Sequence, residues 1–232
     1  MPRKYDSKES KRRILSACVR LFIQKGYHST TLAEILKEAD VTNSTFQNIF
    51  HTKNGVLLNL TEFMFDSQFE AARNVGKKEL PPVYIYAAET AIQLTLTELN
   101  ENLRDIYVEA YSNRNTTEYI FQRTSTELYS IFSPYNPTLS ESDFYELEIG
   151  TSGIMRNYMA RPCDKYFTLD RKLARFLGIS LAAYNVPKDE IKEVTDSVLS
   201  IDIKNVANDI MKKLFEALAM RFEFELGENT VN

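Results

Sequence analysis

The sequence has few of the residues on which small disulfide-bonded or metal-binding folds depend. Its 232 residues include no tryptophan, two cysteines, and only seven each of proline and glycine. Cys18 and Cys163 are too few and too far apart for a disulfide framework or a zinc site, so reduced thiols are expected. Because helix breakers are scarce and apolar residues recur at helical spacing without strand-like alternation, we predict an all-α fold.

Long apolar runs are also missing. No run approaches the roughly 18 apolar residues of a membrane-spanning helix, so we expect no membrane partner. The N-terminal stretch MPRKYDSKESKRR is charged, where a signal peptide would be apolar. Apolar residues make up 44% of the chain and charged residues 26%, which is typical of a globular protein with a buried core. A cytoplasmic location is predicted.

The motifs of common enzymes are absent as well. The chain contains no nucleophile elbow, P-loop, dinucleotide fingerprint or zinc signature. Its only histidines, His28 and His51, do not stand at a metal-ligand spacing and are interpreted as surface residues. We therefore expect no enzyme, and no catalytic residue, metal or cofactor.

Charge is unevenly distributed along the chain. Residues 1–53 carry ten Lys and Arg against five acids, a balance of +5, whereas the other 179 residues carry 18 against 27, a balance of −9. A basic head on an acidic body is typical of a nucleic-acid-binding end attached to a domain that does not bind nucleic acid.

The basic head is predicted to hold three short helices. Ile14, Ala17, Cys18, Leu21 and Phe22 form the apolar face of the first, which ends at Gly26. Thr31 and Glu34 have the spacing of a capping box that opens the second. After a turn at Asp40-Val41, the third runs from Thr42 with Phe46, Ile49 and Phe50 inward, and Thr52 caps a longer fourth helix to about residue 74.

The third helix is unusually polar on its outer face. Hydroxyl and amide side chains are mediocre helix formers, so helix stability does not explain their presence. Two short helices joined by a tight turn, the second apolar inside and polar outside, form a helix-turn-helix that suits the DNA major groove. We predict that the DNA-binding residues are Thr31, Thr42, Asn43, Ser44, Thr45, Gln47, Asn48 and Lys53, with Lys53 placed for a phosphate.

The segment 12–57, RRILSACVRLFIQKGYHSTTLAEILKEADVTNSTFQNIFHTKNGVL, resembles the N-terminal domain of the tetracycline-repressor (TetR) family of bacterial transcriptional regulators. The resemblance implies that Thr31 contacts phosphate, and that Thr45 and Lys53 hold the DNA backbone. It further implies that Thr42, Asn43 and Ser44 lie at the groove end of the recognition helix. This chain has Asp40 where the family usually has glycine, and Gln47 where it commonly has a phosphate-binding tyrosine.

The division of the chain follows from these elements. We predict a DNA-binding domain at residues 1–54, a connecting helix and linker at 55–80, and a helical effector-binding and dimerisation domain at 81–232. Within the last, helices are predicted from Pro81-Pro82 onward, including Thr117 to Phe132, Ser140 to Met159, Asp170 to Tyr184, one opened by Pro187, and a final helix capped by Asp202.

The final predicted helix carries a continuous apolar stripe. Such a stripe is most often core, but in a dimer it could also pack against a partner subunit. Two recognition helices about one duplex turn (~34 Å) apart are needed to read a near-palindromic operator, so a homodimer is expected. Its interface is predicted to include the last helix together with Ser140–Met159 or Asp170–Tyr184. The predicted contact residues are Ile210, Leu214, Leu218 and Phe222.

An effector site is harder to place. Tyr107 and Tyr111, one helical turn apart, are candidate ligand-binding residues in an aromatic-rich interior. Arg156 either anchors an anionic effector or forms an ion pair with Glu146 or Glu148, the interpretation we favour. The small residues of GTSG, Gly150 to Gly153, predict a close backbone approach or a hollow.

Together these features predict a DNA-binding regulator, more specifically a repressor that an unknown small-molecule effector releases from a near-palindromic operator. The effector would favour a conformer whose recognition helices are spaced wrongly. One alternative is a helical dimer that acts through protein partners, or that binds DNA architecturally without a small-molecule switch.

Overall fold

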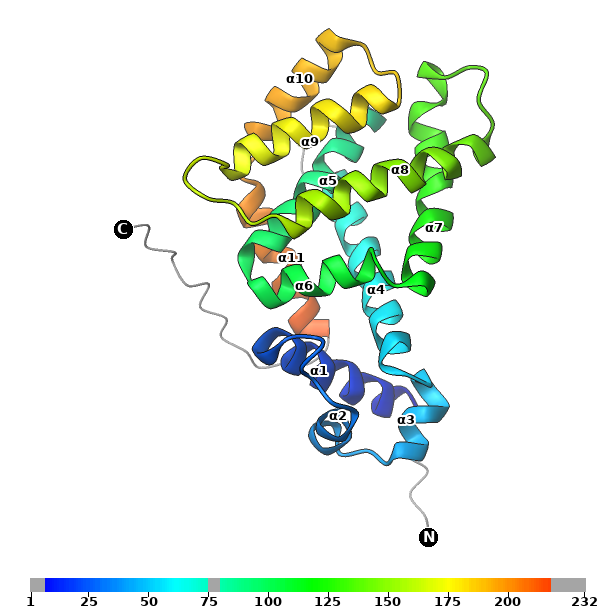
Figure 1. Ribbon diagram of the computed structural model, residues 1–232, viewed down its shortest axis with the longest axis vertical. Coiled ribbons are helices and arrows are strands. Elements are labelled where there is room, and N and C mark those ends of the chain that lie inside the picture. The colour runs from blue at the N-terminus through cyan, green and yellow to red at the C-terminus, as the bar shows by residue number, and fades with distance from the viewer. Residues whose placement is uncertain (1–6, 75–79, 218–232) are drawn as a thin grey trace.

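The computed structural model describes residues 7–74 and 80–217 of the chain, and over these ranges it is helical without a strand (Figure 1). The helices are α1 (Ser7–Lys25), α2 (Leu32–Ala39), α3 (Asn43–Phe50), α4 (Lys53–Asn74), α5 (Pro82–Leu99), α6 (Glu101–Ala110), α7 (Arg114–Phe132), α8 (Glu141–Ala160), α9 (Leu169–Ala183), α10 (Lys188–Leu199) and α11 (Ile203–Ala217), with a 3₁₀ turn at Ser133–Tyr135. The predicted all-α fold is confirmed.

A small head of three helices forms the N-terminal end. Gly26 follows α1 with a φ of +90°, a conformation that a glycine adopts without steric cost. Phe22, Ile35 and Phe46, one from each helix, are fully buried in the shared core. The predicted end of α1 at Gly26 and the predicted starts of α2, α3 and α4 at Thr31, Thr42 and Thr52 agree with the structure.

Helix α4 leaves the head and continues into the larger body, where it packs against α5 and α7 (Figure 1). The body surrounds α5, whose residues Tyr86 to Thr97 are all buried. A helix buried on every side has to place its polar side chains inside the protein, and α5 does so with Glu89, Thr90, Gln93, Thr95 and Thr97.

Helix α6 connects the body with the head. It packs against α1 and lies above it in Figure 1. The side-chain amide of Asn102 donates to the carbonyl of Ile23 at 2.8 Å, and Nε2 of His28 lies 3.4 Å from a carboxylate oxygen of Glu109. A Cβ on Gly26 would come within 3.1 Å of Asn102, so the glycine also permits this close approach.

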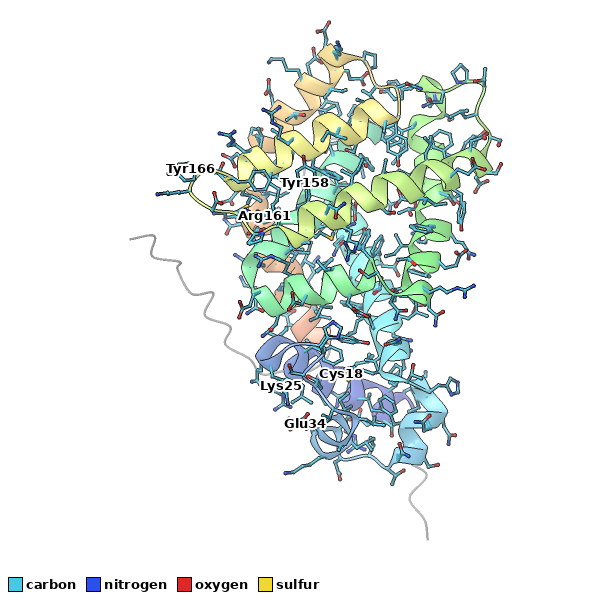
Figure 2. The ribbon with its side chains drawn as sticks, viewed as in Figure 1. Cys18, Lys25, Glu34, Tyr158, Arg161 and Tyr166 are labelled. Carbon is cyan, nitrogen blue, oxygen red and sulfur yellow. The ribbon has the colours of Figure 1, made fainter. Side chains whose placement is uncertain are left out.

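Helices α8 and α9 pack side by side across the body (Figure 1). The loop between them is held by Lys172, which is fully buried, pairs with Glu98 of α5 and donates to the carbonyl of Arg161. Arg161 and Tyr166 of this loop are labelled in Figure 2, and the Tyr166 side chain is 74% exposed. A buried lysine with two oxygen partners thus fixes the α8–α9 pair on α5.

Most predicted boundaries in the body agree with the structure, and the exceptions have local causes. Helix α7 begins at Arg114, three residues before the predicted start, because the Asn113 side chain caps its first turn. The expectation for GTSG is confirmed in one respect, because Thr151 and Ser152 of this segment line a cavity between α5, α7, α8 and α9. A Cβ built on Gly150 or Gly153 would meet no atom within 4 Å, so these glycines do not permit a close approach within the subunit.

Candidate nucleic-acid interface and effector cavity

The outer face of α3 is polar and open to solvent. Asn43, Ser44, Gln47 and Asn48 are exposed there, whereas Phe46 and Phe50 on the opposite face are buried. Their positions place four of the predicted DNA-contacting side chains on one surface of a helix eight residues long. Such a helix presents amide and hydroxyl groups outward while its aromatic face holds it to the head.

The start of α3 is fixed by two threonines. The Thr42 hydroxyl accepts from the backbone N–H of Thr45 at 3.1 Å, and the two side-chain oxygens are 2.9 Å apart. The turn before them contains Asp40 in the left-handed region, with φ 49° and ψ 55°, and its carboxylate lies 3.3 Å from Arg13 of α1. An aspartate therefore performs here the turn for which a glycine is the usual choice.

Thr31 lies exposed at the start of α2. The predicted capping box is confirmed: the Thr31 hydroxyl accepts from the Glu34 backbone N–H, and the Glu34 carboxylate accepts from the Thr31 backbone N–H. Lys25 at the end of α1 also pairs with Glu34, as Figure 2 shows. Hydrogen bonds from Lys25 and Thr31 lower the pKa of Glu34 to about 2, so the carboxylate stays charged.

Lys53 has internal partners that the sequence did not indicate. Its ammonium group donates to the backbone carbonyls of Tyr27 at 2.8 Å and Thr30 at 3.0 Å, and it lies 4.3 Å from the centre of the Tyr27 ring. Burial lowers the pKa of Lys53. Two of its three N–H groups hold the loop that leads into α2, which leaves one for the predicted phosphate contact.

Two of the cavities formed by the described residues involve the predicted ligand residues. An apolar one lies where α1 and α4 meet α6 and α11, and its lining includes both Tyr107 and Tyr111. A polar cavity lies between α5, α7, α8 and α9, and Tyr111 lines this one as well. The structure thus brings Tyr107 and Tyr111 together at the junction of the head and the body.

Arg156 lies outside both cavities. Its Nε donates to the Ser112 hydroxyl at 2.7 Å, and the ion pairs found within residues 7–74 and 80–217 do not include one from Arg156 to Glu146 or Glu148. The favoured ion-pair interpretation was therefore wrong. Glu148 points into the protein and bonds to hydroxyl groups, while Arg156, eight residues further along α8, is half-buried.

The polar cavity contains residues that the sequence analysis missed. Glu89 and Gln93 of α5 and Glu148 of α8 are all buried in its wall. A signal for the first was present, because Glu89 is the only charged residue between Pro82 and Thr97. Glu148 had no such signal, since several exposed acids surround it on α8.

The residues predicted for the dimer interface are not free. Ile210 is 1% exposed and Leu214 is 4% exposed, because α11 packs against α4 and α5 of its own subunit. The prediction was wrong for these two residues, which belong to the subunit core. Leu218 and Phe222 lie outside the described residues.

In the part of the chain that the structure describes, no helix is long and apolar enough to cross a membrane. Among the same residues, no group of three or more His, Cys, Asp or Glu side chains is placed to hold a metal ion.

Residues 14–60, which contain the capping box and α3, match the family model described as bacterial regulatory proteins, tetR family. The uncharacterized HTH-type transcriptional regulator YuxN of Bacillus subtilis (strain 168) is 33% identical over 96 residues, 41% of this chain and 31% of YuxN. The probable HTH-type transcriptional regulator YttP of the same organism is 24% identical over 160 residues, 68% of this chain and 71% of YttP. The match with YuxN thus spans about a third of that relative's length.

Solved structures give a weaker comparison. Two crystal structures of a gamma-butyrolactone receptor (ArpA-like protein) align with 90% and 89% of this chain and with 100% and 98% of their own chains. Their sequence identities are 16% and 18%, and the TM-scores are 0.45 and 0.47.

The helix-turn-helix of the head lies within the segment that matches the family model, and YuxN and YttP are named as HTH-type transcriptional regulators. Over residues 14–60, the chain is thus similar to the tetR family of bacterial regulatory proteins.

Proposed function

We propose that this protein is a ligand-responsive repressor that binds a near-palindromic operator as a homodimer and leaves it when a small molecule occupies the body. The observation that carries the DNA half is the exposed polar face of α3 on a head otherwise closed around Phe46 and Phe50. Its amide and hydroxyl side chains are the groups that read base edges in the major groove.

The proposed DNA contacts are of two kinds, contacts to base edges and contacts to the DNA backbone. Asn43, Ser44, Gln47 and Asn48 are exposed along α3 and are proposed to face base edges. Thr31, Thr42 and Thr45 lie at the starts of α2 and α3, where backbone N–H groups favour a phosphate. Lys53 is proposed to contribute its remaining N–H to the DNA backbone, beside its internal bonds.

The dimer is proposed to form through α8 and α9. Ile149 on α8 is 50% exposed and Ile179 on α9 is 46% exposed, and each has a neighbouring glycine, Gly150 or Gly178, at which a Cβ would meet no atom within 4 Å. Exposed isoleucines beside small residues suit a close contact between helices of two subunits. This surface replaces α11 in the interface that the sequence suggested.

The ligand response is proposed to pass through α6 and α4. Both helices line the apolar cavity, α6 also bonds to α1 through Asn102, and α4 begins directly after α3. A ligand that binds one arrangement of α4 and α6 more tightly than another would change the positions of the recognition helices in the dimer.

The test is fluorescence anisotropy of the purified protein with tiled duplexes from the region upstream of its own gene, at two salt concentrations. We expect tight, salt-sensitive binding to one near-palindrome. Asn43→Ala should reduce the preference between sequences by about 1–3 kcal/mol, because an amide that pairs with a base edge is lost. Lys37→Ala, on the exposed side of α2, is a control outside the recognition helix and should leave the preference between sequences unchanged.

Equal and weak binding to every duplex would contradict the proposed recognition helix and favour a dimer that acts through protein partners. If Asn43→Ala binds one near-palindrome as tightly as the parent protein does, the proposed regulator function stands. Asn43 would then not be one of the residues that contact base edges.

A further inference from the structure

The polar cavity has an unusual chemical lining for the interior of a helical body. Its wall contains two buried carboxyl groups, those of Glu89 on α5 and Glu148 on α8, and three aromatic rings, those of Tyr86, Tyr111 and Phe176. Buried acids are ordinarily paired with a cation or a metal, since isolated charges are costly away from water.

The two carboxyl groups are held by neutral donors alone. Glu148 accepts hydrogen bonds from the hydroxyls of Thr151 at 2.8 Å, Tyr184 at 3.3 Å and Thr124 at 3.3 Å. Oε1 of Glu89 accepts from the side-chain amide of Gln93. Within the described part of the chain, Oε2 of Glu89 has no hydrogen-bond donor, although the side chain is only 3% exposed.

Positive charge is missing from the cavity wall. Among the described residues that line it there is no lysine, arginine or histidine. A third acid, Glu127 of α7, also lines the cavity, but Arg123 at 3.1 Å and Arg73 at 3.5 Å already pair with it. The uncompensated carboxyl groups are therefore Glu89 and Glu148.

We propose that this cavity binds an organic cation whose ammonium group lies at Glu89 and Glu148 and whose apolar part packs against Tyr86, Tyr111 and Phe176. The inference rests on the proposed function, because the cation would be the effector of the repressor. Aromatic rings attract ammonium groups through their negative faces, and two carboxylates supply the opposite charge.

The state of the carboxyl groups without a ligand supports this assignment. Burial raises the pKa of Glu89 to about 8, with a contribution from the negative charge of Glu148, and burial raises the pKa of Glu148 to about 7. Both groups are therefore partly protonated near neutral pH, and a bound cation would return them to the charged form.

The cavity is also connected to the helix that leads to the DNA-binding head. The Tyr111 hydroxyl donates to Gln93 at 2.7 Å, and Gln93 in turn donates to Glu89. The Tyr111 ring centre lies 6.4 Å from that of Phe65 on α4, and both rings line the apolar cavity. A cation that draws Glu89 toward itself would change the hydrogen bonds that fix Tyr111 against α4.

The experiment compares three probes with one skeleton and different head groups: 4-phenylbutylamine, 4-phenylbutanol and 4-phenylbutyrate. Calorimetric titration of the full chain at pH 8 should show the amine binding at least about tenfold more tightly than the alcohol, and the carboxylate not binding. Glu89→Gln and Glu148→Gln should each weaken amine binding by about tenfold. Glu118→Gln, an exposed acid on α7, is the matched control and should leave amine binding unchanged.

Three results would overturn the proposal: no binding of the amine up to about 1 mM, equal binding of the amine and the alcohol, or unchanged amine binding in both glutamine variants. Circular dichroism of the variants separates lost binding from lost folding. Anisotropy with the operator duplex separates this inference from the proposed function. If the amine binds through Glu89 and Glu148 and DNA affinity stays constant, the cavity assignment stands and the ligand-responsive repressor fails.

Discussion

At the scale of single residues, Lys53 shows how a side chain inside the head can support the proposed DNA-binding surface. Its ammonium group holds the carbonyls of Tyr27 and Thr30, directly before the Thr31 cap of α2. Tyr27 is held a second time, because its hydroxyl donates to Asn54 at 2.6 Å. Two consecutive residues at the start of α4 therefore fix the loop that positions α2.

Lys53→Ala is accordingly expected to destabilise the free protein. Two half-buried carbonyls would lose a charged donor, which corresponds to a decrease of about 1–3 kcal/mol in the free energy of unfolding. Urea denaturation without DNA measures this, with Lys37→Ala on the exposed side of α2 as control. Unchanged stability in Lys53→Ala would show that its only role is at the phosphate.

Glu89 and Glu148 predict how stability depends on pH. Their folded-state pKa values, about 8 and about 7, lie above the ordinary value of 4.5, so the folded state binds protons that the unfolded state has released. Stability should therefore fall as pH rises from about 5 to about 8, by a few kcal/mol, since each unit of pKa difference corresponds to about 1.4 kcal/mol. Denaturant titrations at pH 5.5 and pH 8 measure the difference.

Glu89→Gln supplies the control for that pH dependence. A neutral amide of the same shape removes the proton uptake, so the variant should be more stable than the parent at pH 8 and should show a smaller pH slope. The low pKa of Glu34 acts below about pH 4 and does not affect this window. A pH slope equal to that of the parent would mean that Glu89 is ionised in the folded protein throughout.

At the scale of elements, the predictable features were those set by local chemistry. The helix caps are formed by Thr31 with Glu34 at α2 and by Thr42 at α3, through hydrogen bonds between residues three positions apart. Such hydrogen bonds can be predicted from a short segment of sequence. The left-handed Asp40 belongs to the same group. The order of the three helices in the head and the caps of α2 and α3 were therefore predictable from a short segment of sequence.

Features that depend on long-range packing were not predictable in this way. The carbonyl partners of Lys53 lie 23 and 26 residues before it, and the fold alone brings them together. The apolar stripe of α11 showed that a face is buried, but periodicity does not say which chain buries it. The polar cavity likewise depends on four helices that meet around α5, so only the isolated charge of Glu89 indicated it.

At the scale of the whole molecule, the α8–α9 surface connects the structure of one subunit with the function proposed for the dimer. Lys172 and Glu98 fix these helices on α5, and α8 and α9 also supply walls of the polar cavity. A dimer formed there would place the interface next to the proposed ligand site. Ligand binding could then change both the angle between subunits and the path through α6 and α4 to the heads.

The corresponding prediction concerns the state of association. Ile149→Asp and Ile179→Asp should each convert the dimer to monomers, because a carboxylate would be buried at an apolar helix contact between subunits. Both side chains are about half exposed in the isolated subunit, so neither change should unfold it. Leu199→Asp on α10, an apolar residue 37% exposed, is the matched control and should stay dimeric.

Sedimentation velocity gives the mass of each species, and operator anisotropy should show weaker binding wherever the dimer is lost, since one head reads only half a site. If both isoleucine variants remain dimeric, the interface does not lie on α8 and α9. The ligand cavity would then not adjoin the contact between subunits.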